Sequence, residues 1–177
     1  MLRRTVLKIG AAGLLGARGI GADRIEAAET IPSRLLWVHR VQTREEGRVL
    51  YFQDQTLVSE GYHLLCYLLR DVRAEQITRM DLQLIHLLFG MQTWMGTCGI
   101  RQPLRITSGY RTAETNARSE DAALHSQHVT GHAVDFTVEG IPPPVLAKLA
   151  LKFAAGGVGV YPRFVHVDTG PVRRWVG

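Results

Sequence analysis

Two short segments near the C-terminus alternate apolar and polar residues, and their polar residues are histidine and aspartate. In residues 133–138, a period of two places Asp135 on one side of a strand and the large apolar side chains on the other. In residues 164–168, the same period places His166 and Asp168 on one side. We therefore predict two neighbouring strands with one apolar face and one polar face, on which Asp135 and His166 point to a common place.

A second histidine precedes the first of these strands. His128 lies seven residues before Asp135, in the segment Ser-Gln-His-Val-Thr-Gly-His-Ala-Val-Asp. Catalytic zinc sites use three protein ligands with nitrogen or oxygen donors and keep a fourth position for water, whereas structural sites are closed by four ligands rich in cysteine. The combination of His128, Asp135 and His166 thus favours a catalytic Zn²⁺ centre.

Other histidine pairs leave different ligand sets open. His128 and His132 are four residues apart, and His125 and His128 are three apart, so either pair could bind a metal if this segment were helical. Gly131 and the β-branched residues that follow argue against a helix. The remaining histidines lie in apolar or mixed stretches, where packed or surface side chains are expected: His39, His63 and His86.

Several motifs, in order along the chain, resemble the zinc D,D-peptidases of the M15 class. They include Ser-Gly-Tyr-Arg-Thr at 108–112, the Ser-x-His-x-x-Gly-x-Ala-x-Asp block at 126–135, Gly-Gly-Val-Gly-Val-Tyr-Pro at 156–162 and Phe-Val-His-Val-Asp-Thr-Gly at 164–170. The chain is most similar to a branch that cleaves the peptide cross-links of bacterial peptidoglycan. A weaker upstream match extends the similarity over nearly all of the chain after its N-terminal segment.

This resemblance implies a fold, a ligand set and a substrate class. The fold would be of the hedgehog and D,D-peptidase type, with His128, Asp135 and His166 as zinc ligands. The implied substrates are peptidoglycan peptides, hydrolysed by a metal-activated water. Arg111 would lie beside the metal and engage the substrate. A guanidinium could stabilise the oxyanion or bind a substrate carboxylate, and the sequence leaves both roles open.

The resemblance does not assign a general base. Carboxypeptidase members have an acidic residue three positions before the last histidine ligand, and lysostaphin-like relatives have a histidine two positions before it. This chain has Arg163 and Phe164 at those positions. Asp168 could accept the proton of the water or orient the imidazole of His166, and the second role is commoner for such a carboxylate. We therefore predict Arg111 and Asp168 as the catalytic side chains.

Two other functions stay open at this point. The first is a binding module that keeps the fold and the metal and holds the cell-wall peptide without cleaving it. The second is a protein in which zinc has only a structural role. Replacing His128 would unfold such a protein, whereas it would leave an enzyme folded and inactive.

The N-terminus is typical of an exported protein. Arg3 and Arg4 precede a short apolar stretch at 9–17, and small residues follow at 27–28, as in the twin-arginine (Tat) signal of bacteria. The alternative is a basic cytosolic tail. Nine apolar residues are too few to span a bilayer. We expect residues 1–28 to be a Tat-type signal peptide, and the protein to act in the periplasm or cell envelope without a stable membrane span.

The rest of the chain, 29–177, is nearly balanced in charge. The formal net charge of the whole chain is +5, but residues 1–28 hold five of its 21 basic and two of its 16 acidic residues, which leaves +2. No basic run with interleaved aromatic residues is present, so a nucleic-acid partner has little support. About 150 residues suffice for one core and are too few for two. We expect one zinc peptidase domain and a monomeric chain.

The pattern of apolar residues predicts an α+β domain. We expect a small, mainly antiparallel sheet that carries the zinc site and is flanked by helices. The expected elements are strands at 35–41 and 49–52 around a turn at 43–48, helices at 62–69 and 79–94, and a helix at 144–155. Cys66 and Cys98 leave a disulfide open in an exported protein. Cys66, however, lies in an apolar run that favours a buried thiol.

Overall fold

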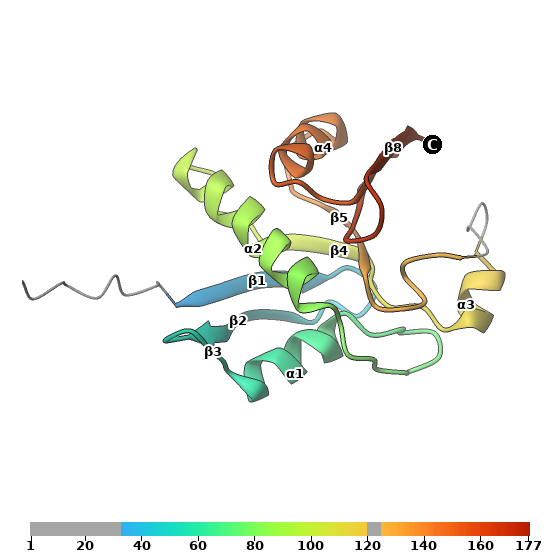
Figure 1. Cartoon of the computed structure of the whole chain (residues 1–177), viewed down its shortest axis with the longest axis horizontal. Coiled ribbons are helices and arrows are strands. Elements are labelled where there is room, and N and C mark those ends of the chain that lie inside the picture. The colour runs from blue at the N-terminus through green and yellow to red at the C-terminus, as the bar shows by residue number, and fades with distance from the viewer. Residues whose placement is uncertain (1–32, 120–124) are drawn as a thin grey trace, which may run out of the picture.

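The computed structural model describes residues 33–119 and 125–177 (Figure 1). The predicted signal peptide, 1–28, lies outside the described residues. The strands are β1 (Arg34–Arg40), β2 (Glu46–Gln53), β3 (Thr56–Leu57), β4 (Leu104–Ser108), β5 (Ala133–Thr137), β6 (Gly157–Val160), β7 (Val165–Asp168) and β8 (Arg173–Val176). The helices are α1 (Ser59–Leu68), α2 (Leu82–Thr97), α3 (Ala113–Ala117) and α4 (Pro143–Lys152).

The strands of the described residues form one mixed sheet in the order β3-β2-β1-β4-β5-β7-β6-β8. Five neighbouring pairs are antiparallel, and the pairs β1–β4 and β6–β8 are parallel. The predicted α+β class is confirmed, but the prediction of a small, mainly antiparallel sheet is only partly met. The short strands β3, β4, β6 and β8 were not predicted. In β6 the glycines, and in β8 the charged residues, obscure the alternation of apolar and polar residues.

The hairpin predicted at 35–41 and 49–52 forms as β1 and β2. Its turn closes earlier than predicted, since the backbone N–H of Arg40 donates to the carbonyl of Glu45 at 2.7 Å. Gly47 therefore lies inside β2. The left-handed conformation that the turn requires is taken by Arg44, with φ of 61°.

The predicted helices form, with small changes at their ends. α2 begins later than the predicted 79–94 because the carboxylate of Asp81 accepts the backbone N–H of Gln83 at 3.1 Å and caps the helix. It continues through Gly96, and Gly99 beyond its end has a left-handed φ of 83°. α1 begins three residues before the predicted position, and α4 ends three residues before it.

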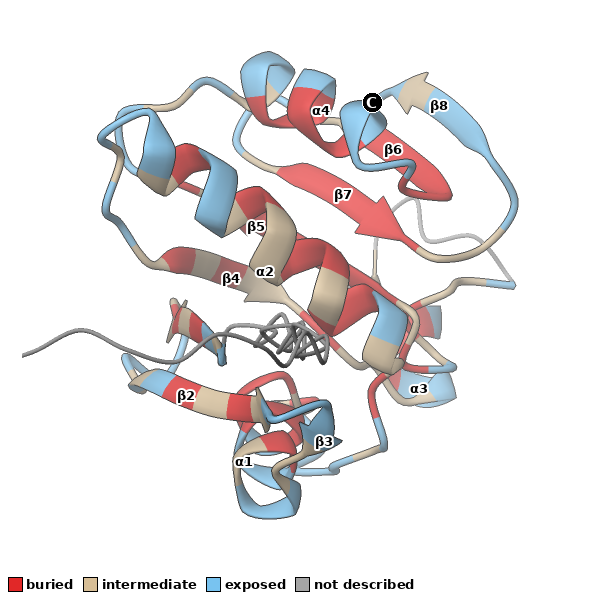
Figure 2. Cartoon of the chain, turned by 60° about the vertical axis from the view of Figure 1, so that its left-hand side comes forward, coloured by how far each residue is buried: buried red, intermediate tan, exposed pale blue. Residues whose placement is uncertain are grey.

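The three longer helices pack against one apolar face of the sheet, as Figures 1 and 2 show. α1 covers β2, α2 covers β1, and α4 covers β6 and β7. One continuous core lies between these helices and the strands. Within the described ranges, none of the helices has the length and apolar character needed to cross a membrane. The opposite face of β5 and β7 carries the polar residues of the predicted site.

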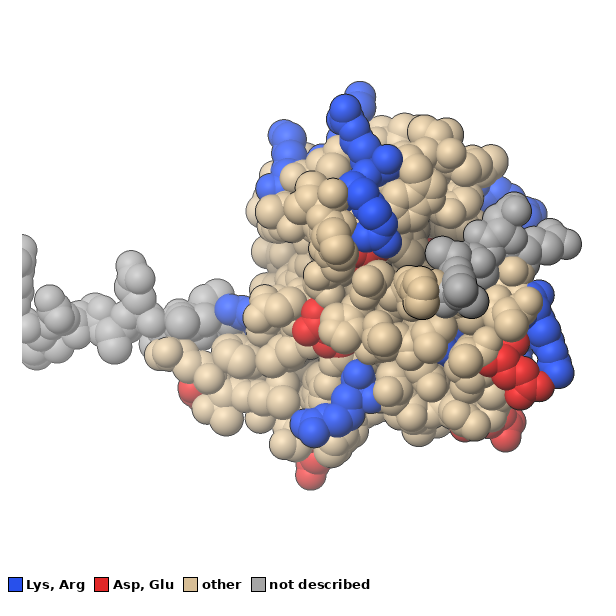
Figure 3. Space-filling view, turned by 45° about the vertical axis from the view of Figure 1, so that its right-hand side comes forward, with Lys and Arg blue, Asp and Glu red and all other residues tan. Residues whose placement is uncertain are grey.

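The surface charges on the face drawn in Figure 3 are dispersed. Lys and Arg side chains lie in separate places, with acidic side chains between them, and no continuous basic patch forms on that face. The absence of a nucleic-acid partner stays a prediction.

Both cysteines are free thiols. Cys66 is buried in α1, where its sulfur accepts the backbone N–H of Met80 at 3.5 Å, and Cys98 is exposed after α2. The prediction of a buried thiol at Cys66 is confirmed, and the disulfide that the sequence left open does not form.

Candidate metal centre

The strands β5 and β7 place Asp135 and His166 directly opposite each other. The two strands are antiparallel neighbours, and Asp135 pairs with His166 in their register. Val134 and Phe136, on the other face of β5, belong to the core. The predicted alternation of an apolar and a polar face is therefore confirmed, because residues directly opposite in antiparallel strands project to the same face.

His128 reaches this pair from a turn. The hydroxyl oxygen of Ser126 accepts the backbone N–H of His128 at 3.3 Å, and Gly131 closes the turn with φ of 75°. His132 turns instead to the hydroxyl of Thr130 at 3.0 Å, and His125 is exposed. Because this segment is not helical, it does not form either of the alternative histidine pairs.

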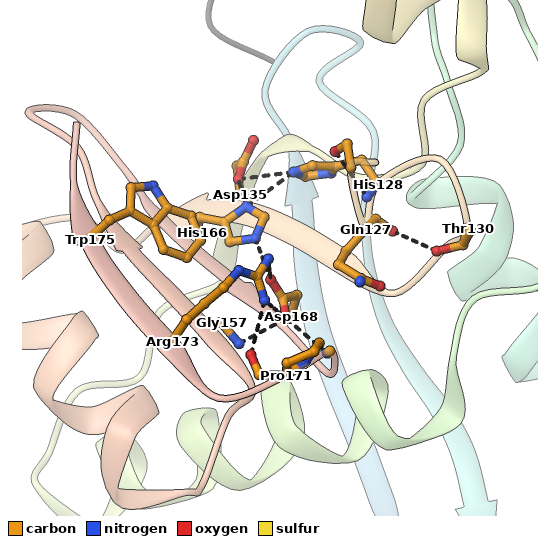
Figure 4. Close-up of polar contacts among 12 residues, drawn as sticks. Gln127, His128, Thr130, Asp135, Gly157, His166, Asp168, Pro171, Arg173 and Trp175 are labelled. Atoms are coloured by element: carbon orange, nitrogen blue, oxygen red, sulfur yellow. Dashed lines mark hydrogen bonds and ion pairs between the residues drawn. The ribbon is translucent and has the colours of Figure 1, made fainter. Parts of the chain in front are cut away.

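The three predicted ligands form one buried cluster of donor atoms (Figure 4). His128 Nε2 lies 3.2 Å and His166 Nδ1 lies 2.8 Å from Asp135 Oδ1. The two ring nitrogens are 3.2 Å apart. Among the described residues, these side chains are the group of histidine, cysteine and acidic donors that could hold a metal ion, with all ligand atoms within 4.8 Å of one another.

The outer nitrogen of each imidazole is already bound. His128 Nδ1 lies 2.7 Å from the carbonyl oxygen of Gly109, and His166 Nε2 lies 2.9 Å from Oδ2 of Asp168. Each outer nitrogen can therefore donate its proton to these acceptors. The inner nitrogens then turn their lone pairs toward one another and toward Asp135. Two lone pairs and a carboxylate that face each other fit a cation, so the residues present fit a metal ion.

The electrostatics of the cluster favour a charged Asp135 and a neutral His128. Burial lowers the pKa of His128 below its ordinary value. Burial alone would raise the pKa of Asp135, but its interactions with His128 and His166 outweigh burial and hold that pKa well below its ordinary value. Burial likewise would lower the pKa of His166, and its hydrogen bonds to Asp135 and Asp168 raise it.

Asp168 lies behind His166 and has no exposed surface. Its Oδ1 accepts the backbone N–H groups of Gly157 and Gly170, each at 2.8 Å. Its Oδ2 accepts from His166 at 2.9 Å and from Arg173 Nη2 at 2.8 Å (Figure 4). A carboxylate held by so many donors fixes the orientation of the His166 ring. The ring of Trp175 packs on the same imidazole, with centroids 5.1 Å apart.

Arg111 lies beside the cluster, as a partner of one predicted ligand. Its Nη2 donates to Oδ2 of Asp135 at 2.7 Å, and its Nε donates to the hydroxyl of Ser108 at 2.8 Å. Its backbone N–H donates to the carbonyl of His128 at 3.2 Å. Arg111 and Asp135 also line a cavity of about 960 Å³, together with residues such as Arg163 and Phe164. The site therefore opens into a space of the size of a small-molecule pocket.

Several groups that hold the site were not predicted as site residues. Arg173 binds Asp168, the carbonyl of Gly109 binds His128, and the backbone N–H of Gly157 binds Asp168. Backbone groups leave no side-chain signal in a sequence. Arg40 and Asp71, which line the cavity and are buried, were also missed. The sequence pattern does single out Arg40, because the period of two in β1 places this charged residue on the same face as the apolar residues.

The chain matches known proteins over nearly its whole length. The family model described as peptidoglycan L,D-endopeptidase MepK matches residues 28–175. Peptidoglycan L,D-endopeptidase MepK of Escherichia coli K12 is 37% identical over 179 residues, which covers 98% of this chain and 96% of the relative; the Shigella flexneri protein of that name gives the same values. Probable peptidoglycan L,D-endopeptidase MepK of Haemophilus influenzae is 40% identical over 119 residues, covering 64% of this chain and 63% of the relative. The predicted resemblance is thereby confirmed, and the chain belongs to the M15 peptidase family described as peptidoglycan L,D-endopeptidase MepK.

Proposed function

We propose that this chain is a zinc-dependent peptidoglycan L,D-endopeptidase with a fold of the hedgehog and D,D-peptidase type. The observation that carries the proposal is the buried cluster of His128, Asp135 and His166 at the edge of a cavity. The relative from Escherichia coli, which is 37% identical over 98% of this chain, bears the name of that activity. The substrate is then a cross-linked peptide of peptidoglycan.

His128, Asp135 and His166 would hold the zinc ion in this enzyme. Zinc with two neutral imidazoles and one carboxylate keeps a positive charge, so it supplies a Lewis acid and a bound water whose pKa is lowered to about 7. Asp135 is suited to this role because it is ionised, and Arg111 holds its second oxygen in place. We assign Asp168 the role of a positioning residue that keeps Nδ1 of His166 directed at the metal position.

Arg111 is proposed to act on the substrate as well. Its guanidinium lines the cavity next to Asp135, where it could stabilise the oxyanion or bind a substrate carboxylate. Arg111→Lys keeps the charge and loses the planar fork. We expect this variant to keep its fold and bound zinc and to lose most of its turnover. Metal content and circular dichroism, measured beside activity, separate this result from a loss of zinc.

We also propose export through the Tat pathway and action in the periplasm or cell envelope as a monomer. The support is the twin arginine and apolar stretch of residues 1–28, together with the cell-wall substrate named for the relatives. A reporter fused to residues 1–40 should be exported only in cells with a working Tat translocase. Changing Arg3 and Arg4 to lysine should stop that export. Export of the unchanged fusion without the translocase would reject the route.

A binding module is the second candidate, and one observation favours it. Among the described residues that line the cavity, the acidic side chains are Asp71 and Asp135, and both already accept several hydrogen bonds. Asp168 is fully buried behind His166. No free carboxylate in the described part of the cavity is therefore available as a general base.

One experiment separates the two candidates. Zinc-loaded protein is incubated with purified cross-linked muropeptides, beside a chelated sample and His166→Ala, and the products are identified by mass spectrometry. The endopeptidase predicts zinc-dependent conversion of dimeric to monomeric muropeptides, cleaved at an L,D bond. Stoichiometric zinc binding and muropeptide binding without any cleavage would reject the enzyme and support the binding module.

A further inference from the structure

One buried arginine near the site lacks hydrogen-bond partners for most of its donors. Arg40 ends β1 on the apolar face of the strand, and only 3% of its surface is exposed. Its Nε and Nη1 have no hydrogen-bond partner among the described residues. Its Nη2 makes one long hydrogen bond, of 3.4 Å, to the carbonyl of Arg70. A guanidinium carries five N–H donors, so most of its donors are unused.

The acidic neighbours of Arg40 attract its charge but accept no hydrogen bond from it, because their oxygens bind other donors. Glu45 forms an ion pair with Arg70 at 2.9 Å. The carboxylate of Asp71 accepts the backbone N–H groups of Thr112 at 2.9 Å and of Arg73 at 3.0 Å. Burial lowers the pKa of Arg40 to about 10, so the side chain still carries its charge at neutral pH. Burying a charged group whose donors make no hydrogen bonds costs free energy that folding must offset.

Arg40 faces the cavity that also contains the proposed catalytic groups. The same space of about 960 Å³ is lined by Arg40 and Asp71, and by Arg111 and Asp135 at the candidate metal centre. Further arginines line it: Arg73, Arg118 and Arg163. Five arginines and two aspartates line the cavity, so its lining carries a net positive charge. A cavity of this volume can hold a ligand of several residues, so one peptide can span both places.

We propose that Arg40 forms a carboxylate-binding subsite, which holds a free carboxylate of the peptide whose bond lies at the metal centre. The inference rests on the proposed function and extends it to substrate choice. Peptidoglycan peptides carry free carboxylates. A guanidinium that is already buried binds such a group strongly, because little water has to be removed from the guanidinium on binding. The subsite therefore selects peptides that carry an anionic group.

The stability of an Arg40 variant separates a binding role from a structural one. Arg40→Met keeps the apolar stem and removes the charge. A buried cation held for a ligand leaves the protein at least as stable when it is removed, because binding sites are kept at the expense of stability. We expect the Tm of the ligand-free variant to equal or exceed that of the unchanged protein. A clearly lower Tm would indicate that Arg40 supports the fold.

Kinetics with two matched substrates test the subsite directly. The substrates are a cross-linked muropeptide dimer with free carboxylates and the same dimer with its carboxylates converted to carboxamides. We expect the unchanged enzyme to prefer the acid by about 10- to 100-fold in kcat/KM, since hydrogen bonds to charged groups have this strength. Arg40→Met should lose this preference through a higher KM with little change in kcat. Arg101→Met, an exposed arginine away from the cavity, is the control and should keep the preference.

A binding measurement keeps this inference separate from the proposed function. Calorimetry with metal-free protein compares the acid and carboxamide dimers, and requires no turnover. If the unchanged protein cleaves no muropeptide, the proposed function fails, and the loss of acid preference in Arg40→Met still supports the subsite. If Arg40→Met binds the acid as tightly as the unchanged protein does, the subsite is rejected, whether or not the protein is an endopeptidase.

Discussion

The β1–β2 hairpin and the β5–β7 pair are both antiparallel, but they differ in how far their polar side chains are buried. In β1 and β2 buried residues alternate with exposed or half-buried ones, whereas all of β7 and four of five residues of β5 are buried (Figure 2). Apart from the buried Arg40, the charged residues of the hairpin, such as Glu46, are exposed or half-buried. Those of the pair, Asp135, His166 and Asp168, are enclosed.

This difference indicates that β5 and β7 keep buried polar residues for function and not for stability. A surface ion pair contributes little to stability and can be lost without consequence. A buried carboxylate or imidazole must be satisfied by partners, and apolar residues of similar size would stabilise the pair equally well or better. The polar interior of β5 and β7 is therefore best explained by chemistry, whereas the polar face of the hairpin is explained by solvation. Each of the next two predictions contrasts a buried residue of the pair with a residue of the hairpin or its turn.

The largest contrast is expected between His166 and His39. His166→Ala removes one proposed zinc ligand, and we expect turnover of cross-linked muropeptides to fall by about 10³-fold or more, because metal polarisation of the water and carbonyl is lost. His39, on β1, pairs with Glu46 at the surface, and His39→Ala should leave turnover unchanged. Activity and zinc content are measured for both variants.

The His166 variant must also remain folded for this contrast to hold. Arg173 and two backbone N–H groups still bind Asp168 when the imidazole is removed, so circular dichroism should match the unchanged protein. An unfolded variant would instead favour a structural role for the metal.

The second contrast compares two carboxylates that each bind an arginine. Asp168 has no exposed surface and binds Arg173, whereas the side chain of Glu45 is 29% exposed and binds Arg70. Asp168→Ala leaves buried donors without an acceptor, and we expect it to lower the free energy of unfolding by about 3–5 kcal/mol. Glu45→Ala should lower it by less than about 1 kcal/mol. Urea unfolding measures both, and equal losses would contradict the comparison.

The third contrast concerns two glycines. A side chain at Gly159 of β6 would lie 2.5 Å from the indole of Trp175, which packs on His166. Gly159→Ala must displace that ring, and we expect a loss of about 1–3 kcal/mol together with weaker zinc binding. Gly96 in α2 has no heavy atom within 4 Å of such a position, so Gly96→Ala should stabilise the helix by up to about 1 kcal/mol. Thermal unfolding and zinc titration measure the two effects. Unchanged zinc affinity in Gly159→Ala would show that Trp175 does not support the ligand.

The same two regions explain what could be predicted from the sequence. The hairpin was predicted because its alternation follows from one solvated face, and Asp135 and His166 were placed together because they interrupt two apolar strands at the same phase. β6 and β8 were missed since their form depends on contacts with other strands. Gly157 and Gly159 leave room for Asp168 and Trp175, a requirement that exists only once β6, β7 and β8 are assembled.

The roles of the predicted side chains were harder to assign than their positions. Arg111 was expected beside the metal, and its contact with Asp135 is a property of the folded turn that no spacing encodes. Arg40 was overlooked although it occupies an inward position of a predicted strand. An arginine at such a position has to be stabilised by partners, so a charge that interrupts the buried side of an alternating strand is a candidate for a binding role.

The smallest expected effect is the pH dependence of the stabilisation that Glu45 gives at the turn of the hairpin. The hydrogen bond from Arg70 is the main reason that the pKa of Glu45 is lowered from 4.5 to about 2. The folded protein thus binds this proton less readily than the unfolded chain, so the stabilisation is fully present above pH 4.5 and is lost as the pH falls toward 2.

Glu45→Gln should be less stable than the unchanged protein by under about 1 kcal/mol at pH 7, and the difference should vanish near pH 2 and shrink in high salt. Asp168 titrates in the same direction in both proteins, so its contribution cancels in this difference. Urea unfolding at several pH values measures it, and a difference that persists at pH 2 would show that Glu45 acts through packing and not through its charge.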